Sequence, residues 1–253
     1  MRVVRVVPGR QWHALDDDEV VGRATLLRRP DGRAYVAADA WKDEVTVALL
    51  RAAIADVPGD LHSTVAEDDA AQLALLSGVG FAEHRREHEY LIPVAGVLAG
   101  PAGAVPDGVR IVSAAGVDVA RLMRLDDLLR QDVPGTDGWV NELEEFREYT
   151  FGSPQFDPEL YLVAVTDEDR YAGLVRLWPA HRVPRLGLIG VLRPYRRRGL
   201  AAALLHAAFR PLAGRGVEQV SAEADVTNTA SVTLLTTLGA VRTGGAIELR
   251  RPG

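Results

Sequence analysis

A chain of 253 residues, of which 47% are hydrophobic and 25% charged, has the composition of a folded protein with one large or two ordinary domains, and this excludes disorder. The chain contains no cysteine, which excludes disulfide bonds, thiolate metal sites and a covalent cysteine intermediate. Its formal net charge of -6 argues against general binding of nucleic acid, which needs a basic face. No run approaches the ~20 apolar residues that span a bilayer, and the first residues are too polar for a signal peptide, so we expect a cytoplasmic protein without a membrane partner.

The first part of the chain alternates strand and helix patterns. The expected elements are strands within residues 20–41, a helix over 45–54, a strand near 61–66, a helix over 70–76 and a last strand ending at Ile92. The stretch 94–108 is rich in glycine, alanine and proline and carries no charge before Asp107, which is typical of a linker. We therefore expect domains at 1–93 and 109–253, joined by a linker over 94–108.

A possible zinc motif lies near the end of the first part. The stretch from His84 to His88 has the spacing HxxEH, which binds zinc when both histidines lie on one helix. Here the stretch runs into the strand pattern that ends at Ile92. On a strand, residues four apart are separated by about 13 Å and cannot share a metal ion, so we expect no metal site.

The second part contains a longer series of elements. The expected elements are a strand at 109–112, helices over 117–129 and 141–150, a hairpin of strands 160–165 and 172–177, a buried strand at 185–191, a helix from 200, a strand at 217–226, a helix from 228 to about 238 and closing strands near 246–251. Asn228 is a typical N-cap for the last of these helices, and Gly239 is a typical C-cap.

An arginine cluster separates the strand at 185–191 from the helix that starts at 200. Its loop, Arg193–Arg198, concentrates four guanidinium groups, and Gly199 allows close approach of the backbone. A helix start also offers unpaired amides to an anion, so the junction is typical of a phosphate site. The sequence matches neither the P-loop nor the dinucleotide motif GxGxxG, and a solvated basic surface is the alternative.

The six residues Arg196–Ala201 resemble the RxxGxA form of the pyrophosphate loop in the GNAT (GCN5-related N-acetyltransferase) superfamily. The Asn228-led helix and its Leu-Gly-Ala corner resemble the second signature of that superfamily, at matched spacing. The resemblance covers about residues 109–250. It implies an α+β fold of three α/β/α layers, with mixed, mostly antiparallel sheets.

Residues 1–93 resemble a second, reduced GNAT unit, because their elements repeat the order of the second part. Trp41 to Val45 takes the place of the cofactor loop but offers neither glycine nor arginine, and Asp43 and Glu44 would repel a pyrophosphate. We expect a degenerate domain with a packing, pocket-closing or regulatory role. The arrangement resembles that of tandem GNAT proteins of the mycothiol-synthase kind.

The resemblance implies acetyl-CoA as co-substrate, with its pyrophosphate on the amides of Arg197–Ala202. Arginine side chains of the loop would add charge-assisted bonds, and the Val191 N–H would stabilise the developing oxyanion. A plain core valine is the alternative for Val191. The expected cofactor-binding residues are Val191, Leu192, Arg193, Arg196, Arg197, Arg198, Gly199, Leu200, Ala201, Ala202, Asn228 and Ser231.

Proton transfer needs a basic group near the thioester, and Glu223 is the first candidate. It matches the position of the general base in ribosomal-protein-type N-acetyltransferases and lies on the polar face of its strand, with a solvated carboxylate as the alternative. Weaker candidates are His181 and Asp225. The family's general acid is a tyrosine, but Leu235 stands at that position, so either Ser231 or Tyr195 serves or the thiolate leaves unaided.

The acceptor is expected beside the helices over 117–129 and 141–150, whose acidic excess favours a cationic amine, with solvated helix surfaces as the alternative. We predict transfer of an acetyl group from acetyl-CoA to a primary amine of a small molecule, directly and without a metal. The alternatives are a non-catalytic acyl-CoA-binding sensor or regulatory module, and a self-resistance or carrier-interacting protein.

Overall fold

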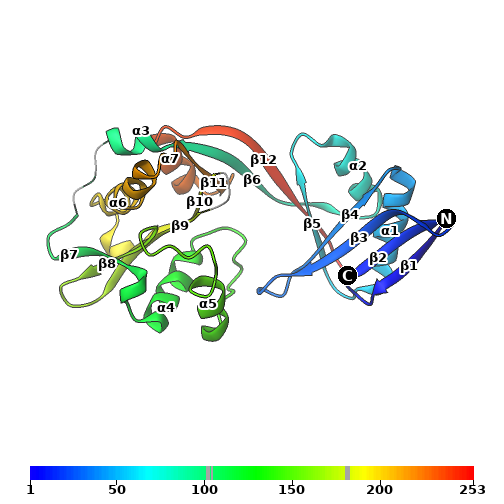
Figure 1. The fold of residues 1–253 in the computed structure, drawn as a ribbon, viewed down its shortest axis with the longest axis horizontal. Coiled ribbons are helices and arrows are strands. Elements are labelled where there is room, and N and C mark those ends of the chain that lie inside the picture. The colour runs from blue at the N-terminus through cyan, green and yellow to red at the C-terminus, as the bar shows by residue number, and fades with distance from the viewer. Residues whose placement is uncertain (101–102, 104, 180–182) are drawn as a thin grey trace. The chain divides into compact units, whose positions relative to one another are not determined.

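The computed structural model describes residues 1–100, 103, 105–179 and 183–253, which form two compact units (Figure 1). The first unit consists of Met1–Glu87 and Gly244–Gly253, and the second of His88–Thr243. Each unit has its own hydrophobic core. In the part of the chain described, none of the helices is both long and apolar enough to cross a membrane.

The first unit is a sheet with helices on one face. Its elements are β1 (Arg2–Val7), β2 (Gln11–Asp16), β3 (Glu19–Arg28), β4 (Ala34–Ala40), α1 (Asp43–Asp56), β5 (Leu61–Ala66) and α2 (Ala70–Gly78). The strands β1 to β4 form an antiparallel meander, whereas β4 and β5 run parallel. Leu49 and Leu76 of the two helices are fully buried in the same core as Trp12 of β2 and Val36 of β4.

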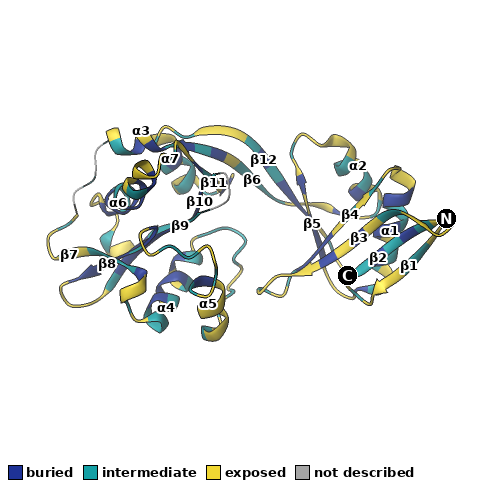
Figure 2. Ribbon diagram, viewed as in Figure 1, coloured by how far each residue is buried: buried dark blue, intermediate teal, exposed yellow. Residues whose placement is uncertain are grey.

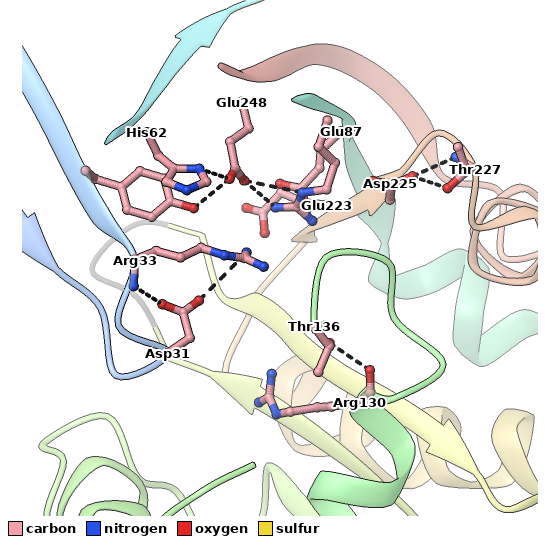
Figure 3. A network of polar contacts seen from close by, with 12 residues as sticks. Asp31, Arg33, His62, Glu87, Arg130, Thr136, Glu223, Asp225, Thr227 and Glu248 are labelled. Carbon is pink, nitrogen blue, oxygen red and sulfur yellow. Dashed lines mark hydrogen bonds and ion pairs between the residues drawn. The ribbon is translucent and has the colours of Figure 1, made fainter. Parts of the chain in front are cut away.

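The other face of this sheet buries polar side chains. Tyr35 lies between Ala34 and Val36, which belong to the core, so its side chain points to the opposite face. There the Glu248 carboxylate accepts a hydrogen bond of 2.9 Å from the Tyr35 hydroxyl and lies 2.9 Å from Nδ1 of His62. Figure 3 shows the His62 ring and the Glu248 carboxylate facing each other.

The second unit contains the longer series of elements. These are α3 (Val94–Ala99), β7 (Val109–Ser113), α4 (Val119–Arg130), α5 (Leu143–Thr150), β8 (Tyr161–Thr166), β9 (Tyr171–Trp178), β10 (Arg185–Val191), α6 (Leu200–Gly214), β11 (Gln219–Asp225) and α7 (Thr229–Thr237). The strands β6 (Ala82–Pro93) and β12 (Val241–Arg251) each cross the boundary between the units. The hydrogen-bonded strand order is β1-β2-β3-β4-β5-β12-β6-β11-β10-β9-β8-β7. This mixed, mostly antiparallel sheet confirms the expected α+β fold class.

Alternation along β8 explains the three layers of the second unit. Tyr161, Val163 and Val165 pack with α4 and α5, whereas Leu162 and Ala164 face the core that contains α6. Successive residues of a strand point to opposite faces, so the sheet is covered on both sides. In Figure 2 the strands of this unit accordingly carry long buried stretches.

The division of the chain differs from the expected boundaries at three places. Residues 88–93 belong to the second unit rather than to a domain 1–93. Residues Gly244–Gly253 belong to the first unit rather than to a domain 109–253, because β12 pairs antiparallel with β5 from Ala246 to Arg251. The expected linker 94–108 begins with helix α3, whose Val94 and Val97 are buried in the core of the second unit. A low-charge stretch rich in small residues therefore contributes to packing there.

Candidate active site

The site is built on a parallel strand pair. The strands β10 and β11 pair at Arg185 with Ser221, and the Ser221 N–H donates to the Pro184 carbonyl at 2.8 Å. Within the described chain these two strands share no further register pair. The β10–β9 register shifts around Gly187, which marks a bulge, and bulges bend a strand and increase its twist. The ends of β10 and β11 are therefore free to separate toward Val191.

The backbone at Val191 faces that opening. The Leu192 N–H donates to the Ala172 carbonyl at 2.8 Å, which directs this amide toward β9. Because amides alternate in direction along an antiparallel ladder, the Val191 N–H points away from β9 and toward the β11 side. The Val191 carbonyl on the same side accepts a bond of 2.7 Å from Nε of Arg196.

The loop after β10 ends in a left-handed residue. A short 3-10 turn, Arg193–Tyr195, leads to Arg197 with φ 62° and Gly199 with φ 83°. Gly199 is the N-cap of α6 and makes no side-chain cap, so among the described residues the amides of the first turn have neither an intrahelical nor a capping partner. The backbone of Gly103 lies against this turn, since a Cβ built on Gly103 would meet the Gly199 carbonyl oxygen at 2.5 Å.

A cavity of about 290 Å³ lies beside this junction. It brings together the predicted site residues Val191, Arg196, Ala201, Asn228 and Ser231. The rest of its lining is Leu129, Asp132, Val133, Ile189, Gly190, Ala230 and Leu234. The remaining predicted cofactor residues lie outside this lining, on the loop and the first turn of α6: Leu192, Arg193, Arg197, Arg198, Gly199, Leu200 and Ala202.

Asp132 forms ion pairs with two arginines of the loop. Its carboxylate is bonded to a terminal nitrogen of Arg196 and lies 3.5 Å from Arg193. The hydrogen bond from Arg196 holds the pKa of Asp132 below its usual range. Arg197 and Arg198 are exposed, and no ion pair of either is found within the described residues. All four arginines of the loop are thus exposed, and two of them are paired with Asp132.

Asn228 caps α7, and its neighbour Asp225 has turned inward. The Asn228 side-chain oxygen accepts from the Ser231 amide at 3.0 Å, which is the N-cap bond expected from the sequence. Asp225 is buried and accepts from the Thr227 amide at 2.8 Å and from its hydroxyl at 2.5 Å (Figure 3). Asp225, the weaker candidate for the base, is therefore covered by the turn after β11.

Glu223 lies on the exposed side of β11 and is held by an arginine. Its carboxylate accepts a bond of 2.7 Å from Nε of Arg185, at the opposite end of β10 from Val191. Glu223 is not part of the cavity lining. Leu235, at the place of the family tyrosine, is buried at 3% exposure, and His181 lies outside the described residues.

The helices α4 and α5, beside which the acceptor is expected, carry acids with hydrogen-bond partners. Asp126 is completely buried, bonded to Arg130 and 3.4 Å from a terminal nitrogen of Arg176. Asp127 accepts from the Asn141 side chain at 2.6 Å. Asp126 is thus balanced by arginines, whereas Asp127 keeps its charge and accepts from an uncharged amide.

The Asp126 cluster also contains polar atoms without hydrogen bonds. Within the described residues, Oδ2 of Asp126, the Tyr161 hydroxyl and Nε of Arg176 are buried without a hydrogen-bond partner. Burial raises the pKa of the Tyr161 hydroxyl, and the Arg176 guanidinium lies 4.9 Å from the Trp178 ring centroid. Sequence reasoning missed this cluster because Arg176 lies in a strand pattern that is otherwise apolar.

Comparisons with known proteins agree with this geometry. Residues 122–240 match the family model described as the acetyltransferase (GNAT) family. No curated protein matches the chain. The second half of the chain therefore belongs to the GNAT superfamily of acetyltransferases.

Solved structures extend the likeness to the whole chain. A GCN5-related N-acetyltransferase from Sphaerobacter thermophilus matches with a TM-score of 0.72 and 21% identity, over 97% of this chain and 82% of that one. A tandem GNAT protein from the clavulanic acid biosynthesis pathway matches with a TM-score of 0.72 and 16% identity, over 96% and 82%. A GCN5-related N-acetyltransferase from Kribbella flavida matches with a TM-score of 0.61 and 17% identity, over 100% and 90%. At these identities the likeness concerns the fold, which is that of tandem GNAT proteins.

Proposed function

We propose that the protein transfers an acetyl group from acetyl-CoA to a primary amine of a small molecule, by direct transfer in a ternary complex. The observation that carries this proposal is the parallel pair β10–β11, joined at Arg185 near the start of β10 and followed by the left-handed Gly199 at the start of α6. Membership of the second half in the acetyltransferase family supports the same reaction.

The described residues suit a diphosphate and a thioester. Unpaired amides of the first α6 turn and the exposed Arg197 and Arg198 supply donors for phosphate oxygens. The apolar part of the cavity beside Val191 suits a pantetheine arm. Bound CoA supplies the activated acyl group. The Val191 N–H then lies where it can stabilise negative charge on the thioester oxygen.

Glu223 is our candidate for the group that takes the proton of the amine. Release from Arg185 would free its carboxylate for that role. The nitrogen attacks the thioester carbon, the carbon–sulfur bond breaks, and sulfur leaves as thiolate. A thiol pKa near 8.5 makes this departure feasible without a tyrosine at the Leu235 position.

Turnover of acetyl-CoA against a panel of primary amines tests this proposal, with thiol release as the readout. The wild-type protein should release thiol with at least one amine, and Glu223→Gln should lose most of that rate. Glu218→Gln, an exposed charge change near the start of β11, is the matched control and should keep it. Absence of turnover with every amine would refute the transferase.

A CoA-binding sensor is the second candidate, and the buried Leu235 at the place of the family tyrosine favours it. The same experiment separates the two functions. Tight binding of CoA without turnover of acetyl-CoA would identify the sensor.

A further inference from the structure

Two arginines of the loop that would bind the diphosphate are paired with a carboxylate from the proposed acceptor side. Asp132 lies just after helix α4, and its carboxylate bonds Arg196 and lies 3.5 Å from Arg193. The guanidinium of Arg196 links this carboxylate to Val191, because its Nε also donates to the Val191 carbonyl. Asp132 therefore connects the cofactor loop with the end of β10.

A diphosphate competes with Asp132 for the same arginines. It carries more negative charge than one carboxylate and offers several oxygens to planar guanidinium groups, so it is the stronger partner. The side chains of Asp132 and Arg196 are each 41% exposed, and an ion pair this exposed is weak and readily exchanged. Binding of the cofactor would thus take the arginines away from Asp132.

The released carboxylate would stay in a mainly apolar cavity. Apart from Arg196, the described lining of this cavity contains Asp132 as its charged group, among residues such as Leu129, Val133 and Ile189. A carboxylate that has lost its arginine partners in such a lining attracts another cation. The nearest reacting group would be the thioester beside Val191.

We propose that Asp132 is a switch: it pairs with Arg193 and Arg196 in the free protein, and after the diphosphate of acyl-CoA displaces it, it binds the ammonium group of the amine acceptor. The inference rests on the proposed function and adds to it a residue that recognises the charge of the acceptor. By linkage, the cation and the cofactor then strengthen each other's binding.

Two CoA derivatives test the switch without knowledge of the natural acceptor. S-(2-aminoethyl)-CoA carries an ammonium beside the thioester position, and S-propyl-CoA is its uncharged counterpart. The wild-type protein should bind the aminoethyl derivative about fivefold more tightly in calorimetric titrations, and Asp132→Asn should lose this preference. Unmodified CoA should bind Asp132→Asn about threefold more tightly than wild type, because a competitor is removed, whereas pantetheine, which lacks the diphosphate, should gain nothing.

Matched variants decide between the outcomes. Glu145→Gln removes one negative charge from the exposed face of α5 and should behave as wild type toward all four ligands. A preference that survives in Asp132→Asn, or is lost in Glu223→Gln instead, would overturn the switch, and so would weaker binding of CoA by Asp132→Asn. Failure of wild type to bind CoA at all would refute the proposed function itself.

Discussion

The two units contain the same strand arrangement and differ in the turn after it. In the first unit β4 and β5 are parallel and pair at Ala34 with Leu61 and at Tyr35 with His62, and in the second β10 and β11 pair at Arg185 with Ser221. In both pairs the pairing lies at the start of the first strand. The turns are different, because β10 leads into an arginine loop and a left-handed glycine, whereas β4 leads into an acidic helix start.

The presence of a cavity does not distinguish the units, because each unit has one. A cavity of about 460 Å³ lies at the end of β4, with Trp41, which is 95% exposed, and Asp39 in its lining. Lys42 precedes α1 without a side-chain cap, and Asp43 and Glu44 occupy the first turn, where they would repel phosphate. The comparison teaches that the chemistry of one turn, rather than topology or volume, decides which unit suits a diphosphate.

The units also bury their polar groups differently. In the first unit Glu248 is bonded to Tyr35, His62 and Arg85, which joins the network at 3.0 Å. In the second unit Oδ2 of Asp126 has no hydrogen bond within the described residues and is balanced by nearby charge. The cluster of the second unit is therefore the more sensitive to loss of one partner.

Breaking that second cluster should have the largest effect. Asp126→Asn keeps the shape but removes the charge that balances buried Arg176, which should cost about 3 kcal/mol of unfolding free energy. Denaturant unfolding of the second unit measures this loss. Glu145→Gln changes the same charge on the surface and should be neutral, and equal stability of the two variants would contradict the account.

The second largest effect is expected from replacing the left-handed Gly199. Gly199→Val places a branched side chain at φ 83°, which strains the backbone of the turn. The variant should raise the Kd of CoA about tenfold. Gly32→Val introduces the same strain at φ 82° in the first unit, where an added Cβ meets nothing within 4 Å. It should leave the Kd unchanged in calorimetric titrations. Equal losses in both variants would mean that the effect is general strain.

An acidic residue introduced at the start of α6, as in α1, separates the effect of charge from that of side-chain size. Ala201→Glu places a carboxylate in the first turn of α6, as Glu44 does in α1, and should weaken CoA binding about fivefold more than Ala201→Gln. The difference between the two variants should shrink at high salt. Identical binding by both would show that only the size of the side chain matters.

The smallest effect concerns acid stability of the first unit. Burial lowers the pKa of His62, so the folded state binds its proton less readily than the unfolded state, and stability falls as the pH drops below the ordinary histidine value near 6.5. His62→Gln should flatten the change of unfolding free energy between pH 7 and 5. His206→Gln in the second unit is the control, and a flattening in the control alone would contradict this assignment.

Local patterns were enough to predict much of the second unit. The apolar run 185–191, the alanine-rich helix after Gly199 and the Asn228 cap all depend on neighbours in the sequence, and each lies where expected. The site around them depends on contacts across the chain. Asp132 reaches Arg196 from a loop 64 residues away, and no local pattern marks it.

The same reason explains two further features that the sequence did not predict. Glu248 joins Tyr35 and His62 only because β12 returns to pair with β5. The helix at Val94–Ala99 lies in a stretch whose composition is that of a linker, and only its packing against the core gives it structure. Both features are set by tertiary contacts rather than by propensity.

The most direct test of the central claim is the stoichiometry of CoA binding by calorimetric titration. We predict one CoA per chain, retained in Trp41→Ala, which alters the cavity of the first unit, and weakened in Ala201→Glu. Two CoA molecules per chain, or loss of binding in Trp41→Ala with normal binding in Ala201→Glu, would contradict the claim that the turn after β10 forms the cofactor site.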